Sequence, residues 1–246
     1  MSSKDEVVLK FDSAVKEFRD GPNTIRALDS IDFSISKGEM VAITGRSGSG
    51  KSTLLNIAGG LEFLTAGDVY VLGNSLTIID TKKLSSLRCN TIGYVFQNLN
   101  LIPALTAQQN VAIPLEFDGT KKSEADELAM LALRRVGIEE LANRTPKELS
   151  GGQRQRVAIA RAIVGPRQLL LADEPTGALD DLTARGVMDL LAEIAEEGTA
   201  VAVVTHDPEL AAYANRIVRL KDGKIEEVSQ NSSKNSAVID SDEKES

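Results

Sequence analysis

An octapeptide at residues 45–52 carries the first residues whose types and spacing point to chemistry. Its sequence, Gly-Arg-Ser-Gly-Ser-Gly-Lys-Ser, fits the phosphate-loop pattern G-x-x-x-x-G-K-[ST]. Glycines let the backbone N–H groups of such a loop turn toward phosphate oxygens, and the following helix presents its positive end. Lys51 would reach the terminal phosphates of a nucleotide, and the Ser52 hydroxyl would ligate Mg²⁺. The predicted nucleotide-binding residues are Gly45, Arg46, Ser47, Gly48, Ser49, Gly50, Lys51, Ser52 and Thr53.

Two acidic residues end an apolar segment further along the chain. Residues 169–172 read Leu-Leu-Leu-Ala, and Asp173 and Glu174 follow directly. α/β proteins place ligand chemistry at the carboxyl ends of their strands. Asp173 is therefore suited to hold Mg²⁺, and Glu174 to orient or deprotonate a water molecule. An isolated Asp-Glu pair would be better explained as a solvated loop, but the upstream phosphate loop favours a catalytic pair.

Alternating strand and helix patterns surround these residues. Apolar runs at 40–44, 169–172 and 200–204 predict buried strands, and helix patterns begin at Lys51 and Gly151. The order predicts an α/β layered domain with a largely parallel sheet. The same context disfavours the alternative that the glycine-rich segment is a turn without a ligand.

The middle of the chain has a different texture. Residues 98–148 read as mostly helical, which predicts a helical lobe inserted between two parts of the sheet. Ser123 and Asp126 have the spacing of a helix start, and an apolar face of that helix would include Ala125 and Leu131.

Composition and charge limit the possible partners. The 246 residues include 36 acids and 28 bases, a formal charge of −8, which disfavours nucleic acid as a partner. No apolar run approaches the roughly 20 residues that span a bilayer, so we expect a soluble chain. The one cysteine, Cys89, predicts a reduced thiol without an internal disulfide. The acidic total does not oppose nucleotide binding, because Lys51, Mg²⁺ and oriented amides would set the local field.

Residues 149–153, Leu-Ser-Gly-Gly-Gln, lie shortly before the strand that ends in the two acids. Together with the phosphate loop and the Asp-Glu pair, in this order, they resemble the ATP-binding subunits of ABC (ATP-binding cassette) transporters. The resemblance runs over residues 7–227. It implies a P-loop NTPase core with a largely parallel sheet, an antiparallel β subdomain and an inserted helical subdomain.

The resemblance implies a site shared between two copies of the chain. Ser150, Gly151, Gly152 and Gln153 would form the signature motif, which contacts the γ-phosphate of ATP bound to the opposite protomer. A helix amino terminus aimed at an anion is the physical basis of that contact. Ala178-Leu179-Asp180 resembles the D-loop at the dimer seam, where Asp180 is the site residue.

Three more residues take roles from the resemblance. Gln97 would contact Mg²⁺ and the attacking water, so that the metal set is Ser52, Gln97 and Asp173. His206, the only histidine, follows a predicted strand and would touch the γ-phosphate; with Glu174 and Gln97 it completes the catalytic set. Phe18 stands where the family often has a tyrosine that stacks on adenine, and burial in the core is its alternative role.

These assignments predict one ABC ATPase domain over residues 1–227. The core would comprise about 6–96 and 164–227, the helical lobe about 97–163, and an acidic, disordered tail 228–246. The implied ligands are ATP and Mg²⁺. The implied partners are a second ATPase subunit, in a homodimer or a heterodimer, and an integral-membrane permease. The chain would then lie at the cytoplasmic face of the cell membrane.

Residues 99–107 and 177–180 look most like the branch that serves macrolide exporters, lipoprotein-release complexes, haem exporters and division complexes. The predicted function is therefore the ATPase of an exporter of a hydrophobic or amphipathic substrate. One alternative is an ATPase that drives a membrane partner mechanically, without transport. A soluble ABC ATPase of DNA repair or translation is disfavoured by the acidic charge and the single cassette. A P-loop kinase is also disfavoured, because that function gives no role to residues 149–153.

Overall fold

Two β-sheets and a group of helices make up the computed structural model, which describes residues 6–177 and 179–231. The first sheet is antiparallel and has the strand order β2-β1-β4-β5. Its strands are β1 (Val7–Asp20), β2 (Asn23–Ser36), β4 (Ala66–Val71) and β5 (Asn74–Ser75).

The second sheet has the order β10-β9-β3-β8-β7-β6 and is parallel except for β10. Its strands are β3 (Met40–Thr44), β6 (Ile92–Val95), β7 (Leu169–Asp173), β8 (Ala200–Val204), β9 (Arg216–Lys221) and β10 (Lys224–Gln230). Central strands β7 and β8 are buried on both faces, which explains their unbroken apolar sequences.

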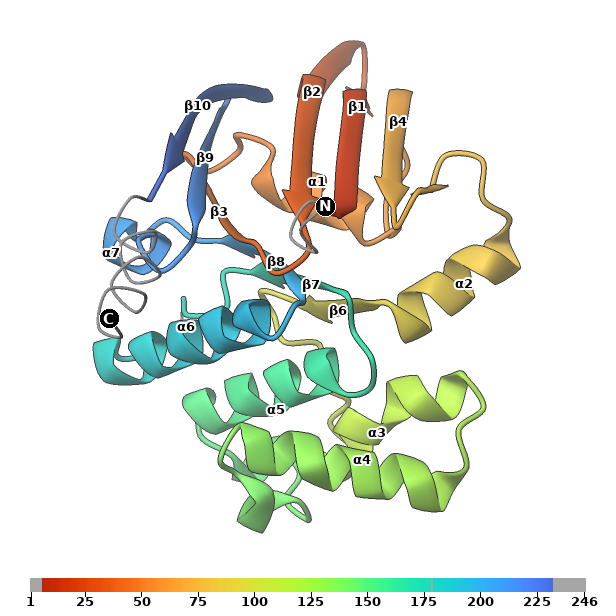
Figure 1. Cartoon of the computed structure of the whole chain (residues 1–246), viewed down its shortest axis with the longest axis vertical. Helices are drawn as coiled ribbons and strands as arrows, with labels where there is room; N and C mark the ends of the chain where they lie inside the picture. The colour runs from red at the N-terminus through yellow and green to blue at the C-terminus, as the bar shows by residue number, and fades with distance from the viewer. Residues whose placement is uncertain (1–5, 178, 232–246) are drawn as a thin grey trace, which may run out of the picture.

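Helices cover the parallel sheet on both sides (Figure 1). The helix α1 (Lys51–Ala58) lies between the two sheets, while α6 (Asp181–Glu196) packs on the opposite face; α2 (Thr81–Asn90) and α7 (Pro208–Ala211) are peripheral. The predicted fold is confirmed: an α/β core with a largely parallel sheet and a separate antiparallel sheet.

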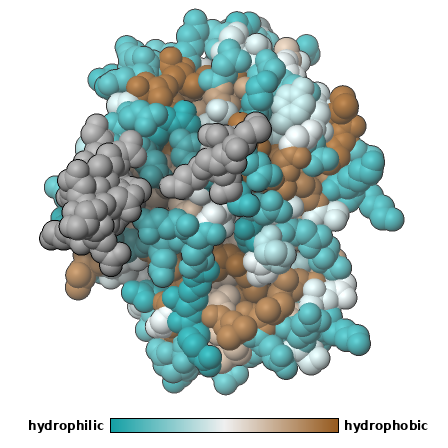
Figure 2. Space-filling model, in the orientation of Figure 1, coloured by the Kyte–Doolittle hydropathy of each residue, from teal (hydrophilic) through white to brown (hydrophobic). Residues whose placement is uncertain are grey.

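Three helices between β6 and β7 lie below the sheet in Figure 1. They are α3 (Ala107–Phe117), α4 (Lys122–Arg135) and α5 (Gly151–Ile163). The 3-10 turns η1 (Glu139–Leu141) and η2 (Pro146–Glu148) lie between α4 and α5. Hydrophobic surface gathers over α3 and α5 in the lower half of the molecule (Figure 2). One continuous apolar cluster joins α3, α4 and α5 to the lower face of the parallel sheet and to α6. These helices therefore share their core with the sheet.

Gly93, in β6, marks the closest approach of the parallel sheet to α5. A Cβ at this position would lie 2.0 Å from the carbonyl oxygen of Ala162. We expect Gly93→Ala to lower the free energy of unfolding by about 1–3 kcal/mol, since strand and helix would have to separate. Gly186→Ala is the control: no atom lies within 4 Å of its Cβ, so alanine in mid-helix should be neutral or stabilising. Urea unfolding of both variants checks this, and equal stabilities would contradict the expected close contact.

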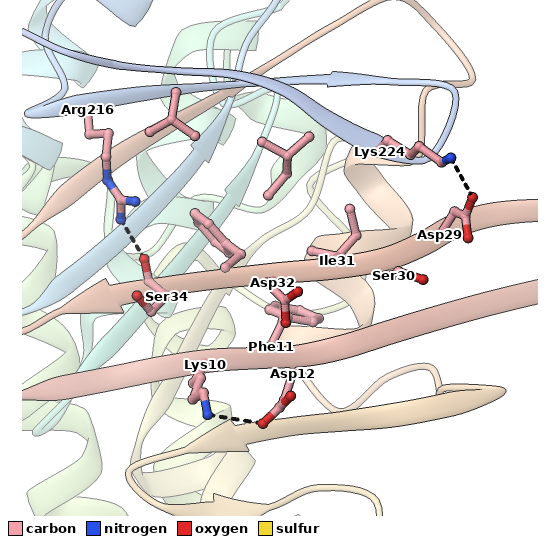
Figure 3. Close-up of a pocket in the computed structure, with 13 residues that line it drawn as sticks. Lys10, Phe11, Asp12, Asp29, Ser30, Ile31, Asp32, Ser34, Arg216 and Lys224 are labelled. Atoms are coloured by element: carbon pink, nitrogen blue, oxygen red, sulfur yellow. Dashed lines mark hydrogen bonds and ion pairs between the residues drawn. The ribbon is translucent and has the colours of Figure 1, made fainter.

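The two sheets face each other across a cavity of about 730 Å³ (Figure 3). The charged residues that line it have polar partners: Lys10 pairs with Asp12 at 3.1 Å, Lys224 with Asp29 at 3.1 Å, and Arg216 bonds to the Ser34 carbonyl. Asp32 accepts a hydrogen bond from the Ser13 N–H. The contacts of Lys224 with Asp29 and of Arg216 with Ser34 join the two sheets, whereas the other two lie within the antiparallel sheet.

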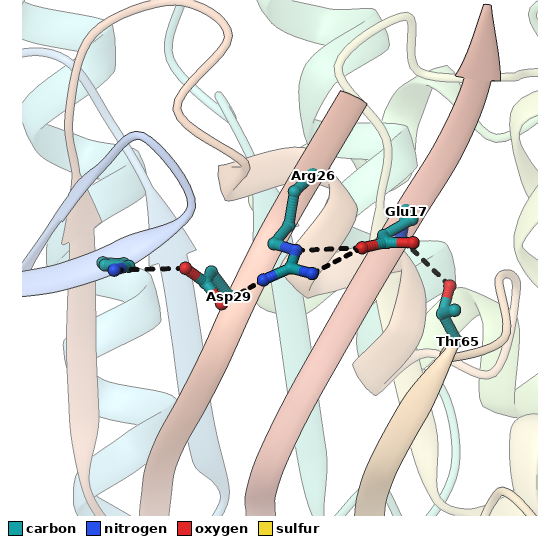
Figure 4. Close-up of polar contacts among 5 residues, drawn as sticks. Glu17, Arg26, Asp29 and Thr65 are labelled. Atoms are coloured by element: carbon teal, nitrogen blue, oxygen red, sulfur yellow. Dashed lines mark hydrogen bonds and ion pairs between the residues drawn. The ribbon is translucent and has the colours of Figure 1, made fainter. Parts of the chain in front are cut away.

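A chain of ion pairs continues this connection (Figure 4). The Arg26 guanidinium donates to Glu17 at 2.8 and 2.9 Å and to Asp29 at 3.1 Å, so that it joins β1 and β2 to Lys224 of β10. Lys224 beside Asp29 holds the pKa of that carboxyl below its usual range, and Arg26 adds to the effect.

Three expectations from the sequence need correction: the end of the ordered chain, the start of α4 and the buried face of α4. The ordered chain extends past residue 227, because Val228, Ser229 and Gln230 continue β10 against β9; the remaining tail, from residue 232, lies outside the described residues. The helix α4 begins at Lys122, and Ser123 makes no cap there. Leu131 is 56% exposed, so the buried face of α4 is formed by Ala125, Ala129, Ala132 and Leu133.

Candidate active site

The phosphate loop follows β3 and leads directly into α1. Gly50 is the N-cap of that helix and has φ 104°, a left-handed conformation that favours glycine. A Cβ there would lie 2.3 Å from the Ala27 carbonyl oxygen of β2. The backbone of the antiparallel sheet therefore lies so close to the loop that a side chain at position 50 would clash with it. Glycine at this position lets the chain turn and begin α1.

The loop also holds two polar groups of the kind that a phosphate needs. Lys51 Nζ donates to the carbonyl oxygens of Gly45 and Arg46 at 2.9 Å, which keeps the ammonium over the loop. Ser49 Oγ is buried and has no hydrogen-bond partner among the described residues. A buried hydroxyl without a partner is costly. This one lies beside Gly45, where a Cβ would come within 2.7 Å of it, and it does not line the nucleotide cavity.

Asp173 ends β7 with a carboxylate whose Oδ1 is buried and unpartnered in the described structure. Burial raises the pKa of Asp173, and Glu174 raises it further, while the neighbouring Ser52 hydroxyl and Lys51 lower it. A buried carboxylate beside a hydroxyl is an oxygen donor set that Mg²⁺ accepts. Ser52 and Asp173 therefore fit the metal predicted for this place.

Glu174 and His206 form a hydrogen-bonded pair at the carboxyl ends of β7 and β8. His206 Nδ1 and Glu174 Oε2 are 2.7 Å apart; the Glu174 side chain is 17% exposed and that of His206 71%. Because an ionised carboxylate only accepts, this contact assigns the Nδ1 proton to His206. Glu174 has φ 50°, an uncommon value for a residue with a side chain, and such strain clusters at functional sites.

A cavity of about 330 Å³ gathers most of the predicted site. Apart from Ala27 and Val204, its lining consists of predicted residues: Gly45, Ser47, Gly48, Gly50, Lys51, Ser52, Thr53, Gln97, Glu174 and His206. Arg46, Ser49 and Asp173 belong to the same elements but do not line this cavity. Phe18 is also outside the lining; at 39% exposure it is not a core residue, and Lys16 Nζ lies 4.8 Å from its ring centroid.

The predicted signature residues lie elsewhere, at the start of α5. Ser150 Oγ accepts from the Gln153 N–H at 3.3 Å, and Gln153 Oε1 accepts from the Ser150 N–H at 2.8 Å, a reciprocal cap. Gly151 and Gly152 form the first turn, and a Cβ on Gly152 would lie 3.4 Å from the Thr183 methyl carbon. None of the four lines the phosphate-loop cavity.

Asp180 caps α6 beside this helix start. Its carboxylate accepts from the Thr183 N–H at 3.1 Å and from the Thr183 hydroxyl at 2.8 Å. Leu179 lies next to Gly152, so the predicted D-loop borders the signature turn within one chain. Ala178, also part of the predicted D-loop, lies outside the described residues.

The contacts of the strand just before Gln97 could not be predicted from the sequence. Tyr94, in β6, donates from its hydroxyl to Asn56 Oδ1 of α1 at 2.7 Å, and its ring stacks on Phe96. Nothing in the separate segments around Asn56 and Tyr94 signals that they meet, because the contact depends on how α1 packs over β6.

Comparison with known proteins agrees with this geometry. The family model described as ABC transporter matches residues 28–177, which is more than half of the chain. The chain belongs to the ABC transporter ATP-binding family. It is an ABC ATPase that binds and hydrolyses ATP.

The alignment with this ABC ATPase covers nearly all of one relative's length and about a third of another's. The ABC transporter ATP-binding protein YknY of Bacillus subtilis is 45% identical over 89% of the chain and 95% of its own length. The macrolide export ATP-binding/permease protein MacB of Mannheimia succiniciproducens is 45% identical over 85% of the chain, but only 32% of MacB is covered. The chain thus spans about a third of MacB.

A solved cassette has the same fold. The dimeric, post-hydrolysis structure of the ATP-binding cassette MJ0796 with ADP and phosphate matches with a TM-score of 0.86 and 42% identity, over 91% of this chain and 98% of that one. In the described part of the ABC ATPase, no helix has both the length and the apolar character needed to cross a bilayer.

His206→Ala tests the exposed member of the Glu174 pair in this ABC ATPase. We expect nucleotide affinity to be essentially unchanged and hydrolysis to fall on the order of 10²-fold, because the imidazole contacts Glu174 and lines the cavity without belonging to the phosphate loop. Fluorescent-ATP titration and phosphate release measure the two effects. Loss of nucleotide binding would contradict this division of roles.

Proposed function

We propose that two copies of this ABC ATPase close head to tail around two ATP molecules and drive a separate integral-membrane permease. One observation carries the proposal: the phosphate-loop cavity and the capped start of α5 are separate on one chain. A second copy could bring its helix amino terminus, with Ser150, Gly151, Gly152 and Gln153, to the γ-phosphate. The dimeric structure of MJ0796 supports this arrangement. A related ATPase could replace the second copy in a heterodimer.

The reaction proposed for each site is attack of water on the γ-phosphate, which breaks its bond to the β-phosphate and releases ADP and inorganic phosphate. Glu174 accepts a proton from the water, and His206 holds the Glu174 carboxylate in place and borders the γ-phosphate position. Lys51 and the amides of the phosphate loop stabilise the developing charge, with the partner's helix start on the opposite side. Mg²⁺, when held by Ser52, Gln97 and Asp173, would neutralise charge on the β- and γ-phosphates.

A groove beside Gln97 is suited to the permease. It has a volume of about 570 Å³ and lies between α2, β6, α3 and α5. Phe117, 78% exposed, and Leu61, 38% exposed, provide apolar contacts at its wall. Its charged lining residues are all arginines: Arg88 is exposed, while Arg161 and Arg167 donate to backbone carbonyl groups. We therefore assign as occupant a short permease helix with an apolar face and at least one acidic side chain.

A named relative supports the direction of transport that we propose. The named function of MacB is macrolide export. We extend export of a hydrophobic or amphipathic substrate to this chain, which would then act from the cytoplasmic face of the membrane. The substrate itself would contact the permease.

Phe117→Asp tests the docking groove and the membrane partner together. With the permease co-expressed, the variant should lose co-purification from washed membranes and the stimulation of hydrolysis by permease in proteoliposomes. Hydrolysis by the isolated ATPase should remain. Ile78→Asp is the matched control, since Ile78 is 83% exposed and does not line the groove. ATP-dependent uptake of substrate into inverted vesicles, whose cytoplasmic face is outside, separates export from mechanical drive. Normal assembly of Phe117→Asp would contradict the docking site.

A further inference from the structure

The chain just after Gln97 is held in a strained conformation. Leu99 and Asn100 have φ values of 59° and 47°, so two consecutive residues with side chains adopt the left-handed conformation. This conformation costs Leu99 about 1–2 kcal/mol relative to a right-handed residue, whereas asparagine adopts it more readily. A single turn of hydrogen bonds is local to this segment, from Leu99 N–H to Phe96 O at 2.9 Å and from Asn100 N–H to Asn98 O at 2.6 Å. Strain of this size persists only where surrounding groups hold it.

Arg161 is the side chain that holds it. This residue lies in the last turn of α5, and its guanidinium donates to Leu99 O at 2.5 Å and to Asn100 O at 2.7 Å. The planar fork reaches both strained carbonyl groups at once, a geometry that lysine does not offer. Burial lowers the pKa of Arg161, but a guanidinium stays protonated in proteins. These hydrogen bonds are therefore charge-assisted.

The two ends of the segment are fixed independently. Asn110 of α3, fully buried, accepts from the Ile102 N–H at 2.7 Å and donates to the carbonyls of Ile102, Leu105 and Thr106. On the other side, the Tyr94 hydroxyl ties β6 to α1 through Asn56. Gln97 thus lies between a fixed strand and the two carbonyl groups that Arg161 holds.

We propose that Arg161 is a positioning residue, which ties the backbone after Gln97 to α5 and so couples the place of Gln97 in the nucleotide cavity to the helix that starts with the signature residues. α5 is one helix from Gly151 to Ile163, so a shift of its start as a unit would move Arg161 with it. This inference rests on the role proposed above for Gln97. In this proposal α5 acts on two sites: its start contacts the ATP of the partner copy, and Arg161 near its end positions Gln97 of its own chain.

Arg161→Gln tests the tie, with Arg156→Gln as the matched control. Arg156 is on the same helix and also donates to a carbonyl, that of Val136 at 2.8 Å, but it lies away from Gln97. In hydrogen exchange of the isolated ATPase, Arg161→Gln should speed exchange of the amides of residues 98–101 and Arg156→Gln should not. Arg161→Lys keeps the charge and loses the fork, so it should give an intermediate result and serves if the glutamine variant does not fold. Unchanged exchange in both Arg161 variants would overturn the tie.

The kinetic test separates positioning from stability. Arg161→Gln should lower kcat by about tenfold or more with little change in KM for ATP, since a small displacement of a positioned group costs rate. Gln97→Ala should give a similar loss. In the variant that combines Arg161→Gln and Gln97→Ala, the two losses in kcat should not multiply. Both changes act through the placement of the Gln97 side chain.

Two outcomes would contradict different claims. Losses that multiply in the double variant, with Gln97→Ala impaired by itself, would overturn the positioning role of Arg161 and leave the role of Gln97 intact. A Gln97→Ala variant with full kcat would instead contradict the role proposed for Gln97, and with it the coupling. The binding of fluorescent ATP with and without Mg²⁺ gives a readout that does not depend on turnover: the gain in affinity from Mg²⁺ should shrink in Arg161→Gln and stay unchanged in Arg156→Gln.

Discussion

Glu174→Gln is expected to lower the rate of ATP hydrolysis by about 10²–10⁴-fold, the range for removal of a general base, while ATP binding remains. Glutamine keeps the shape of the side chain and an oxygen that can accept from His206, so the cavity is preserved and only the proton acceptor is lost. Because ATP is bound but not consumed, the proposed dimer should accumulate. Phosphate release measures the first effect, and size-exclusion chromatography with ATP and Mg²⁺ the second.

Glu209→Gln is the control for this substitution. Glu209 is 79% exposed, lies on α7 and pairs with Arg185, so its neutralisation should leave hydrolysis unchanged. Steady-state turnover of Glu174→Gln at the unmodified rate would show that Glu174 is not the base. A catalytically dead variant that stays monomeric with ATP would contradict the shared site while leaving the base assignment in place.

Asp173→Asn changes activity and stability in opposite directions. Hydrolysis should fall by at least about 10²-fold, because the proposed Mg²⁺ site loses its carboxylate. The nucleotide-free and metal-free protein should instead become more stable near neutral pH, by about 1 kcal/mol, because a buried charge is removed. Phosphate release and urea unfolding in EDTA measure the two changes.

The pH dependence follows from the direction of the shift. Burial raises the pKa of Asp173 in the folded state, so the folded protein binds this proton more tightly than the unfolded chain does. The contribution of Asp173 to stability is therefore greatest at low pH and is lost as the pH rises through its folded-state pKa. The gain from Asp173→Asn should accordingly be larger at pH 8 than at pH 4.

Asp68→Asn gives the opposite sign and serves as the control. Burial opposes its charge, but the hydroxyls of Thr77 and Ser75 and the Val69 N–H lower the pKa of Asp68 overall. Its stabilisation is present at neutral pH and lost in acid, so asparagine should destabilise the protein near pH 7. If Asp173→Asn also destabilised the metal-free protein, the effect assigned to its burial would be wrong.

Local signals in the sequence predicted well where the elements that carry the candidate site lie. The phosphate loop, the apolar strands β7 and β8 and the limits of α5 depend on residues a few positions apart, and each lies where it was expected. The parallel pairing of Asp173 with Val204 then brings Glu174 and His206 together across the sheet edge. Sequence placed both residues in the site, but their direct contact depends on this register.

Other features depend on packing that no local pattern records. Strands β1 and β2 pair through several register shifts, which break the simple alternation of apolar residues expected of long strands. The helix α4 begins at Lys122 without a side-chain cap, so the capped helix start predicted at Ser123 was wrong. Arg161 meets Leu99 across 62 positions, and it resembled any other basic residue near the end of a helix.

The shared apolar cluster has a consequence for the chain as a gene product. Since α3, α4 and α5 bury their side chains against the same residues as the sheet and α6, neither part has a complete interior when it is produced alone. Residues 97–163 excised as a fragment would expose the face that normally meets Met40, Leu170 and Val201. The unit that can be inherited, fused to a permease or moved between transporters is therefore the whole cassette.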